Sequence, residues 1–229
     1  MILALVPVKD LWQAKQRLAG LLSAAERRAL CLAMLEDVLG ALRAARRLDG
    51  ILVFSPDEDA LAMSRRLGVA AVREPRGRGQ SEAVAAALPL CQANGATTLL
   101  TIPVDTPLLT GEDIDALIAF WHEVALPPPS AVIVPSSDGT GTNALLLTPP
   151  DALPPRFGPD SFARHVHEAE QRNVVHRRFV LPRLGLDIDS PADLAAFLAT
   201  AERAPQQSTS TYQHLRGAGI AERCRARTL

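Results

Sequence analysis

The sequence is short of lysine, cysteine and aromatic residues, and neither sign of charge is in excess. Its 229 residues are 48% hydrophobic and 4% aromatic, with a formal net charge of −1. A charge so close to zero excludes overall positive charge as a means of binding nucleic acid or membranes. No apolar run approaches the roughly 18 to 20 residues of a membrane-spanning helix. We therefore expect a soluble globular protein, built as one large domain in preference to two small ones.

Cysteine and histidine are too few and too scattered to form a metal site or a disulfide framework. Cys31, Cys91 and Cys224 are odd in number and lack C-x-x-C spacing. His165 and His167 lie two residues apart, so on a helix they face different ways. Unpaired cysteines in helix-like segments favour a reducing compartment, and we expect a cytoplasmic protein.

Lysine is the least expected shortage. Of the 24 basic residues, 22 are arginine, and the two lysines, Lys9 and Lys15, both fall within the first fifteen positions. Arginine richness often reflects genome composition. The two lysines are therefore either accidental or retained for a function.

Short apolar runs alternate with longer helical patterns along the chain. Strands are predicted at 2–6, 51–54, 69–72, 98–103, 131–135, 144–147 and 174–180. Capping-box signatures predict helix starts at four places: Ser23 with Glu26, Ser55 with Glu58, Thr110 with Asp113, and Ser190 with Asp193. This order predicts an α/β fold with a mostly parallel sheet and helices on both faces. Ligands of such a sheet bind at the carboxyl ends of its strands.

The pattern weakens after residue 202. The stretch APQQSTSTYQ is polar, and the last segment carries arginines without an apolar stripe. We expect residues 1–202 to form the domain and residues 203–229 to form a mobile basic C-terminal tail, with a solvated tail favoured over a binding segment.

The loop after the first strand holds three cations. Lys9, Lys15 and Arg17 follow Pro7 within a segment that contains neither a G-x-G-x-x-G turn nor a phosphate loop of the G-x-x-x-x-G-K-[ST] type. Three cations at the edge of a sheet suit a polyphosphate, because they neutralise its oxygens and stabilise a leaving pyrophosphate. The alternative is a solvated amphipathic loop.

Carboxylates follow two further apolar segments. Asp105 stands after the apolar run 98–103, where a rigidly held acid suits Mg²⁺, although it could also cap a turn. In an extended segment Asp187 and Asp189 project to the same side, and they repel unless a cation or an arginine lies between them. The three acids together predict a Mg²⁺ site, with a turn acid as the alternative role for Asp189.

Three glycine-containing segments offer backbone amides. Gly79 and Ser81 precede an alanine-rich helix and could approach a base or phosphate, or form a plain turn. The segment 138–143, which includes Thr142, is either an anion-holding concavity or a hairpin turn. Gly158 and Ser161 open a further helix, whose positive N-terminus could hold a phosphate.

Five of these segments, in this order, resemble a known family. They are Pro7-Val8-Lys9 with Ala14-Lys15 and Arg17-Leu18, Asp105 with Pro107, GTGTNALL, RFGPDSFARH and LDIDSPADL. The sequence is similar, over about residues 1–200, to the 2-phospho-L-lactate guanylyltransferases of coenzyme F-420 biosynthesis, whose members also use phosphoenolpyruvate or 3-phospho-D-glycerate. The resemblance implies a three-layer Rossmann-like nucleotidyltransferase fold of the glycosyltransferase-A type.

The resemblance also implies roles for individual residues. GTP would contact Pro7, Lys9, Lys15, Arg17, Gly79 and Ser81. The acceptor acid would contact Thr142, Gly158 and Ser161, and Mg²⁺ would be held by Asp105, Asp187 and Asp189. Asp105 and the three cations would carry catalysis. One departure is Gly79-Gln80-Ser81, where the family commonly has Gly-Leu-Asn, so the preference for guanine is less secure than nucleotidyl transfer.

The expected reaction joins GMP from GTP to the phosphate of a three-carbon acid and releases pyrophosphate. The alternatives are another nucleotidyltransferase, acting on a sugar phosphate or a molybdopterin, and a non-catalytic nucleotide-binding protein on the same fold. We expect no nucleic-acid or membrane partner. A homodimer is the commonest assembly for such a protein.

Overall fold

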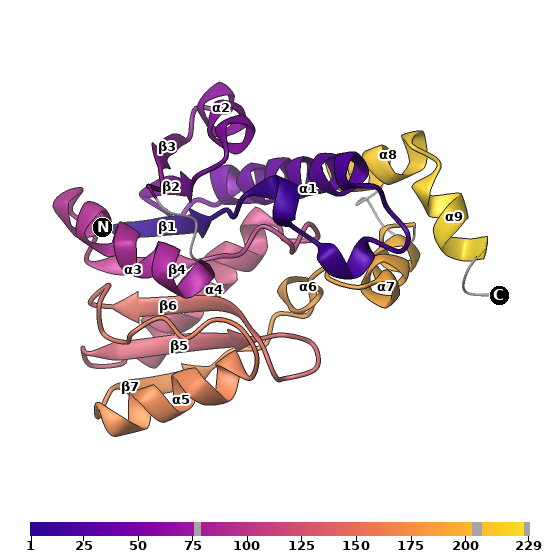
Figure 1. The fold of residues 1–229 in the computed structure, drawn as a ribbon. Coiled ribbons are helices and arrows are strands. Elements are labelled where there is room, and N and C mark those ends of the chain that lie inside the picture. The colour runs from indigo at the N-terminus through magenta and orange to yellow at the C-terminus, as the bar shows by residue number, and fades with distance from the viewer. Residues whose placement is uncertain (76–78, 203–207, 227–229) are drawn as a thin grey trace.

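The computed structural model describes residues 1–75, 79–202 and 208–226. Its centre is a seven-stranded sheet in the order β3-β2-β1-β4-β6-β5-β7 (Figure 1). The strands are β1 Ile2–Pro7, β2 Gly50–Ser55, β3 Ala70–Arg73, β4 Thr98–Thr101, β5 Ser130–Pro135, β6 Thr142–Thr148 and β7 Val175–Arg178. β1 to β4 are mutually parallel and β7 is parallel to β5, whereas β6 is antiparallel to both of its neighbours. The predicted mostly parallel sheet is confirmed.

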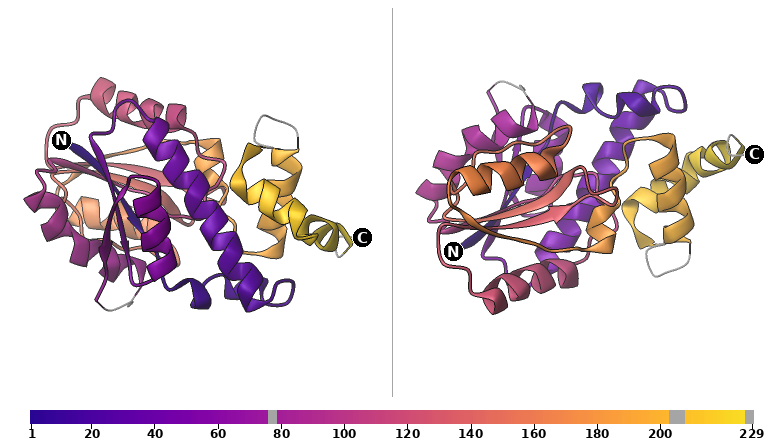
Figure 2. Two further views of the ribbon diagram at one scale, coloured as in Figure 1. Left: turned by 90° about the horizontal axis from the view of Figure 1, so that it is seen from above. Right: turned by 90° about the horizontal axis from the view of Figure 1, so that it is seen from below.

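Helices cover both faces of the sheet because the strand residues alternate between two cores (Figure 2). Ala4 and Val6 of β1 pack in one core with α1 (Ala24–Ala44), α4 (Gly111–Val124) and α7 (Pro191–Ala201). Leu3 and Leu5 point the other way and pack with α3 (Gln80–Ala93) and α5 (Ser161–Gln171). This period of two places successive side chains on opposite faces, so each strand contributes to both cores.

Three of the four predicted capping boxes are present. Ser23, Thr110 and Ser190 each accept from the backbone three residues on, and the acid at that position caps in return. The fourth prediction is wrong: α2 (Glu58–Arg66) begins after Asp57, whose carboxylate accepts from the amides of Asp59 and Ala60. Asp57 takes the role because Ser55 is the last residue of β2 and Asp is an equally strong N-cap.

The C-terminal segment is part of the structure, which corrects the prediction of a mobile tail from residue 203 onward. Residues 208–226 include α8 (Ser210–Gly217) and α9 (Ile220–Ala226), whereas residues 203–207 and 227–229 lie outside the described part. Tyr212, Leu215 and Ile220 are buried in the core that contains α1. The carboxylate of Asp37 on α1 accepts from the backbone amides of Ser210 and Thr211, at 2.7 and 2.8 Å. The two helices thus extend the α1 layer (Figure 1).

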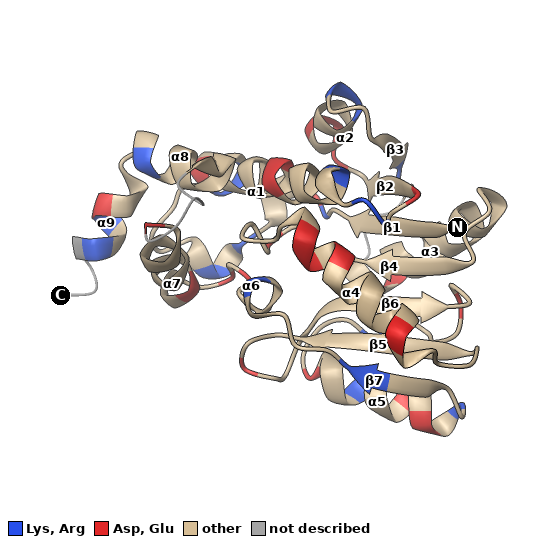
Figure 3. Cartoon of the chain, turned by 180° about the vertical axis from the view of Figure 1, so that it is seen from behind, with Lys and Arg blue, Asp and Glu red and all other residues tan. Residues whose placement is uncertain are grey.

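The near-zero net charge arises from residues of both signs, which lie on different elements. Acidic residues lie along α4 and basic residues lie on β7 (Figure 3), so charge of each sign forms local groups. All three cysteines lie in the described part of the chain, buried and outside any disulfide. In the described ranges we find no helix that is both long and apolar enough to cross a membrane.

Candidate active site

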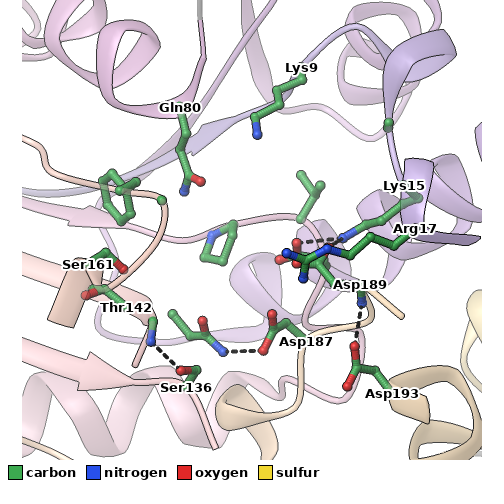
Figure 4. A pocket seen from close by; sticks show the side chains of 18 of the residues that line it. Lys9, Lys15, Arg17, Gln80, Ser136, Thr142, Ser161, Asp187, Asp189 and Asp193 are labelled. Carbon is green, nitrogen blue, oxygen red and sulfur yellow. Dashed lines mark hydrogen bonds and ion pairs between the residues drawn. The ribbon is translucent and has the colours of Figure 1, made fainter. Parts of the chain in front are cut away.

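A cavity of about 770 Å³ opens where the carboxyl ends of β1 and β4 meet the β5–β6 hairpin (Figure 4). Because β6 runs antiparallel to β4, its first residues reach the same edge as the last residues of β1 and β4. The cavity lining includes ten predicted site residues: Pro7, Lys9, Lys15, Arg17, Asp105, Thr142, Gly158, Ser161, Asp187 and Asp189. The structure therefore brings together residues that lie as far as 182 positions apart in the sequence.

The three acids converge through one backbone contact. The amide of Ile188 donates to the carbonyl of Asp105 at 2.9 Å, and the Ile188 side chain is fully buried. Since neighbouring side chains of an extended segment alternate, Asp187 and Asp189 face the cavity. One carboxylate oxygen from each of Asp105, Asp187 and Asp189 lies within 4.8 Å of the other two.

Lys15 supplies the cation that paired carboxylates require. Its ammonium donates to Asp105 at 2.7 Å and to Asp189 at 2.6 Å, and its side chain is only 7% exposed. Burial alone would lower the pKa of Lys15, but the charges of Asp105 and Asp189 outweigh burial and raise it well above its usual range. Lys15 has a left-handed backbone, with φ of 53°, which a non-glycine residue adopts at a cost of about 1 kcal/mol. This conformation starts the short 3₁₀ helix η2 (Gln16–Leu18).

The pKa values of the other acids follow from the same arrangement. Burial and the neighbouring charge of Asp105 raise the pKa of Asp187. Burial has the same tendency at Asp189, but the charge and hydrogen bond of Lys15, with Arg17 and Lys9 further away, lower its pKa overall. Asp187 thus lacks the neighbouring cation that Asp189 has in Lys15.

The cationic loop is held in place by its own anchors. Arg27, itself buried, donates to the carbonyls of Ala14 and Leu22, at 3.3 and 2.9 Å. Lys9 and Arg17 are exposed and line the cavity. Figure 4 shows Lys15 and Arg17 together on the side of the cavity where Asp189 lies. The loop therefore presents one cation bound to the acids and two that face open space.

Thr142 and Ser161 lie together on another side of the cavity, away from Lys15 (Figure 4). Ser161 is the first residue of α5, and Thr142 is the first residue of β6. Gly158 has φ of +114°, a conformation that L side chains rarely adopt, so the turn before α5 requires glycine. The amide of Phe162 donates to the carbonyl of Thr140 at 3.0 Å and joins the start of α5 to the hairpin.

The segment 138–143 is a hairpin turn and not an anion-holding concavity. Gly139 has φ of +76°, and the carboxylate of Asp138 accepts from the amide and hydroxyl of Thr140, at 3.0 and 2.9 Å. The hydroxyl of Ser136 accepts from the Gly141 amide at 2.7 Å and donates to Asp138. These hydrogen bonds, that of Ser136 first, lower the pKa of Asp138 to about 2. The amides that an anion would need therefore already have internal partners.

The loop that carries Gly79 and Ser81 differs from the prediction in detail. Gly79 and Ser81 do not line the cavity, whereas Gln80 between them does. The hydroxyl of Ser81 donates to the carbonyl of Phe157 at 3.3 Å and so ties α3 to the loop before α5. Residues 76–78 of this loop lie outside the described part. Figure 4 shows Gln80 and Lys9 on the same side of the cavity.

Two residues outside the predicted site, Asn143 and Asp193, position the acids. The side-chain amide of Asn143 donates to the carboxylate of Asp187 at 3.1 Å and to the backbone carbonyl of Leu184 at 2.9 Å. The carboxylate of Asp193 accepts from the amides of Asp189 and Ser190, at 3.1 and 2.7 Å. The capping signature at Ser190 pointed to Asp193 as a helix cap, and its contact with Asp189 follows from the same geometry. Nothing in the sequence pairs Asn143 with an acid 44 positions away.

The acidic site fits a hard divalent cation. Carboxylate oxygens are the ligands that Mg²⁺ prefers, and at about 2.1 Å from the ion opposite ligands are about 4 Å apart. The spacing of Asp105, Asp187 and Asp189 is close to this, so small movements would bring all three onto one ion. An ammonium already bound between two of them shows that the site is built to hold positive charge.

The fold and the site together define a nucleotidyltransferase. A solved structure of a protein from Desulfovibrio desulfuricans G20, classed with the nucleotide-diphospho-sugar transferases, superposes with a TM-score of 0.75 over 98% of this chain and 97% of that one, at 18% identity. A nucleotidyl transferase from Methanothermobacter thermautotrophicus superposes with a TM-score of 0.64 over 89% and 98% of the two chains, at 15% identity. At these identities the likeness establishes the fold, which confirms the predicted nucleotidyltransferase architecture.

Residues 2–225 match the family described as "Guanylyl transferase CofC like", and the chain belongs to this family. A phosphoenolpyruvate guanylyltransferase from Sphaerobacter thermophilus is 42% identical over 84% of this chain and 90% of its own length. A 2-phospho-L-lactate guanylyltransferase from Methanothermobacter thermautotrophicus is 35% identical over 87% and 85%. A 3-phospho-D-glycerate guanylyltransferase from Colwellia psychrerythraea is 33% identical over 82% and 87%. The resemblance identified from the five motifs is confirmed.

Proposed function

We propose that this enzyme transfers GMP from GTP to the phosphate of a small three-carbon phospho-acid, as a step of coenzyme F-420 biosynthesis. One observation carries the proposal. A single cavity has a cationic and acidic side, formed by Lys15, Arg17 and the three acids, and a hydroxyl side formed by Thr142 and Ser161. The cationic and acidic side suits a triphosphate with its metal ion. The hydroxyl side suits a small anion, because the oxygens of such an anion only accept hydrogen bonds.

The reaction requires no nucleophilic side chain. A phosphate oxygen of the acceptor forms a bond to the α-phosphorus of GTP, while the bond from that phosphorus to the oxygen bridging to the β-phosphate breaks. The acceptor phosphate is ionised at neutral pH, so no general base is needed. Lys9 and Arg17 would bind the triphosphate and neutralise the leaving pyrophosphate, while the residues on both sides hold the reactants in line. We assign Pro7 and Gln80 to the nucleotide, with Gln80 in place of Ser81.

Asp105, Asp187 and Asp189 would hold Mg²⁺. When bound, the ion would supply charge neutralisation to the triphosphate. Lys15 would share the acids with it, since its ammonium contacts Asp105 and Asp189. Thr142, Gly158 and Ser161 would hold the acceptor. Of the three relatives described above, the one that acts on phosphoenolpyruvate shares the highest identity, so phosphoenolpyruvate is the acceptor we expect.

A competition experiment tests the proposal. The purified protein is incubated with GTP, Mg²⁺ and equal amounts of phosphoenolpyruvate, 2-phospho-L-lactate and 3-phospho-D-glycerate, and the products are detected by mass. We expect a guanylylated acid and an equal amount of pyrophosphate. Parallel reactions with ATP, CTP and UTP measure the preference for guanine. GTP binding without turnover on any acceptor would contradict the proposal and favour a non-catalytic binder. A separate reaction contains a sugar phosphate in place of the three acids, and turnover in that reaction alone would favour another nucleotidyltransferase.

The Asp105→Asn variant tests the metal assignment in the same assay. The substitution keeps the shape of the side chain and removes its charge. We expect pyrophosphate release to fall by about 100-fold or more, as for the removal of other groups that stabilise a transition-state charge. Wild-type rates in this variant with all three acceptors would show that Asp105 does not hold the ion.

A further inference from the structure

His165 is a fully buried histidine whose two ring nitrogens contact two different segments next to the cavity. It lies on α5 with none of its surface exposed. Its Nδ1 is 3.0 Å from the hydroxyl oxygen of Thr142, and its Nε2 is 2.9 Å from the backbone nitrogen of Arg156. The ring also packs edge-on against Phe157, with centroids 5.1 Å apart. His165 therefore joins the first residue of β6 to the loop that carries Gly158.

These contacts fix the position of the proton on the ring. A backbone N–H can only donate, so the amide of Arg156 requires Nε2 to be unprotonated. A neutral imidazole then carries its proton on Nδ1. Burial, together with the charge of Arg164, lowers the pKa of His165 to about 4, which keeps the ring neutral at physiological pH. Nδ1–H therefore donates to the hydroxyl oxygen of Thr142 and shares its proton with the backbone carbonyl of Ser161, whose hydrogen bond opposes the lowering of the pKa.

The proton on Nδ1 determines what the Thr142 hydroxyl can do. A threonine hydroxyl has one proton and accepts through its oxygen. When that oxygen accepts from His165, the hydroxyl proton is left for a different partner. Thr142 lines the cavity although only 5% of its surface is exposed, so the cavity is where such a partner would be found.

We propose that His165 is a positioning residue of the acceptor site: its Nδ1–H holds the Thr142 hydroxyl as a hydrogen-bond acceptor, so that this hydroxyl donates to an oxygen of the bound phospho-acid. The inference rests on the proposed function, because it takes Thr142 as a contact of the acceptor. It adds a residue that never touches the substrate. Through Arg156 and Phe157 the same ring also holds the loop of Gly158, so one side chain sets two parts of the acceptor site.

Substitution of His165 should weaken the binding of the acceptor acid and leave the binding of GTP unchanged. Lys9, Arg17 and the three acids lie on other elements and make no contact with His165 among those found in the described structure. Loss of the Nδ1–H donor should raise the KM for the acceptor about tenfold, the scale expected for one hydrogen bond to a charged group. The KM for GTP should stay within about twofold of wild type.

Two substitutions of His165 each keep one of the two hydrogen bonds of the ring. In His165→Asn the side-chain NH₂ lies near the position of Nδ1 and can still donate to Thr142. In His165→Gln the amide lies near the position of Nε2, where its oxygen can accept from Arg156, and the donor to Thr142 is lost. We expect the acceptor KM to rise in His165→Gln and to be largely restored in His165→Asn. Ala169→Gly, a buried substitution on the same helix, controls for loss of stability alone.

Thr142→Ser and Thr142→Val keep the proposal testable if a His165 variant does not fold. Thr142→Val should raise the acceptor KM as His165→Gln does, whereas Thr142→Ser retains the hydroxyl and should raise it much less. Combining Thr142→Val with His165→Gln should add little, because both variants disrupt the same hydrogen bond from the Thr142 hydroxyl to the acceptor. An equal fall in kcat and in affinity for both substrates, or a His165→Asn variant no better than His165→Gln, would overturn the proposal.

The ring tautomer gives a readout that needs no substrate. Nitrogen-15 NMR of the histidine rings at pH 7 should show His165 protonated on Nδ1 only, and the signal should change in Thr142→Val. A proton on Nε2, or a charged ring, would overturn the inference whether or not the enzyme uses the proposed acceptor. If the tautomer is as expected but the wild-type protein guanylylates none of the three acids, then the proposed function has failed and the hydrogen-bond geometry has not.

Discussion

Lys15 and Asp189 are 174 positions apart in the sequence, yet the ammonium of one lies 2.6 Å from the carboxylate of the other. This ion pair joins the loop after β1 to the segment before α7, and both residues line the cavity. It also changes the role of a predicted phosphate ligand. In the structure Lys15 neutralises the acids on which a metal ion would bind, so the lysine and the ion share one set of ligands.

Substitution of Lys15 by methionine should therefore weaken the fold and make it more dependent on metal. Without the ammonium, Asp105 and Asp189 repel each other and Asp187 nearby. Because the Asp189 side chain is 45% exposed, we expect a loss of only about 1–2 kcal/mol in the free energy of unfolding, less than for a fully buried pair. Urea unfolding with and without Mg²⁺ measures this, and the stabilisation by Mg²⁺ should be larger in Lys15→Met than in wild type.

Lys9→Met is the matched control for that experiment. Lys9 is exposed at the same cavity, and no contact of its ammonium with the acids is found among the described residues. Its substitution should leave unfolding and Mg²⁺ stabilisation unchanged and should weaken GTP binding by about tenfold through the loss of one phosphate contact. If both lysine variants behave alike in unfolding, the distinction between a lysine that binds acids and one that binds phosphate is wrong.

Asp187 provides the sharpest test of the metal site. Burial and the charge of Asp105 raise its pKa, so an added cation relieves its repulsion directly. Asp187→Asn should reduce turnover by about 100-fold and raise the Mg²⁺ concentration needed for half-maximal activity. EDTA should abolish wild-type turnover, and Mg²⁺ should restore it. Asp151→Asn, at an exposed turn outside the cavity, should leave all of these unchanged.

The burial of His165 predicts how stability depends on pH. Burial, with the charges of Arg164 and Arg156, lowers the folded pKa to about 4 from the 6.5 of an unperturbed histidine, against the opposing effects of the Ser161 backbone hydrogen bond and the charge of Glu168. Between these values the unfolded chain binds a proton that the folded protein does not, so stability from this group is fully present above pH 6.5 and is lost as pH falls toward 4. At about 1.4 kcal/mol per pKa unit the loss approaches about 3 kcal/mol.

Urea unfolding from pH 4 to pH 8 measures this dependence. Other groups titrate in the same range, so the relevant quantity is the difference between wild type and His165→Asn. Above pH 6.5 that difference should be constant, and it should shrink as pH falls to 4. A difference that is the same at every pH would mean that the folded pKa of His165 is not lowered.

The sequence was informative where local signals are strong and silent where contacts are distant. All seven predicted strands are present. Most are short apolar runs bounded by turn or cap residues, whereas β7 is the basic segment Val175–Arg178 between apolar residues. The convergence of Asp105 and Asp187 followed from the rule that ligands bind at the carboxyl ends of strands. The pairing of Lys15 with Asp105 and Asp189, and that of Asn143 with Asp187, depends on side-chain directions that no local pattern encodes.

The C-terminal helices were missed for a related reason. The segment 208–226 has too little apolar periodicity to predict a buried face. Its N-cap is local, because the hydroxyl of Thr209 accepts from the Tyr212 amide at 3.2 Å, but the amides of Ser210 and Thr211 have their acceptor on another helix. Asp37 lies in the middle of α1, 173 positions before Ser210. Burial raises the pKa of Asp37, whereas its hydrogen bonds with Thr211 and Ser210 lower it. The effect of burial is larger, so the pKa is raised overall. Propensity and pattern within the segment cannot reveal a hydrogen-bond acceptor that is supplied from so far away.

Asp37→Ala should therefore release the C-terminal helices more than it disturbs α1. The variant leaves the amides of Ser210 and Thr211 without their acceptor, a loss comparable to that of a helix cap, about 1–2 kcal/mol. Hydrogen exchange should show faster exchange across α8 and α9 and little change in α1. Glu36→Ala, the neighbouring acid, is the control and should leave α8 protected.

Because Tyr212 and Leu215 are buried against the core of α1, a chain ending at residue 202 should expose that surface and unfold at lower urea. If truncation leaves the unfolding midpoint unchanged, the helices contribute nothing to stability and residues 1–202 form a complete folding unit.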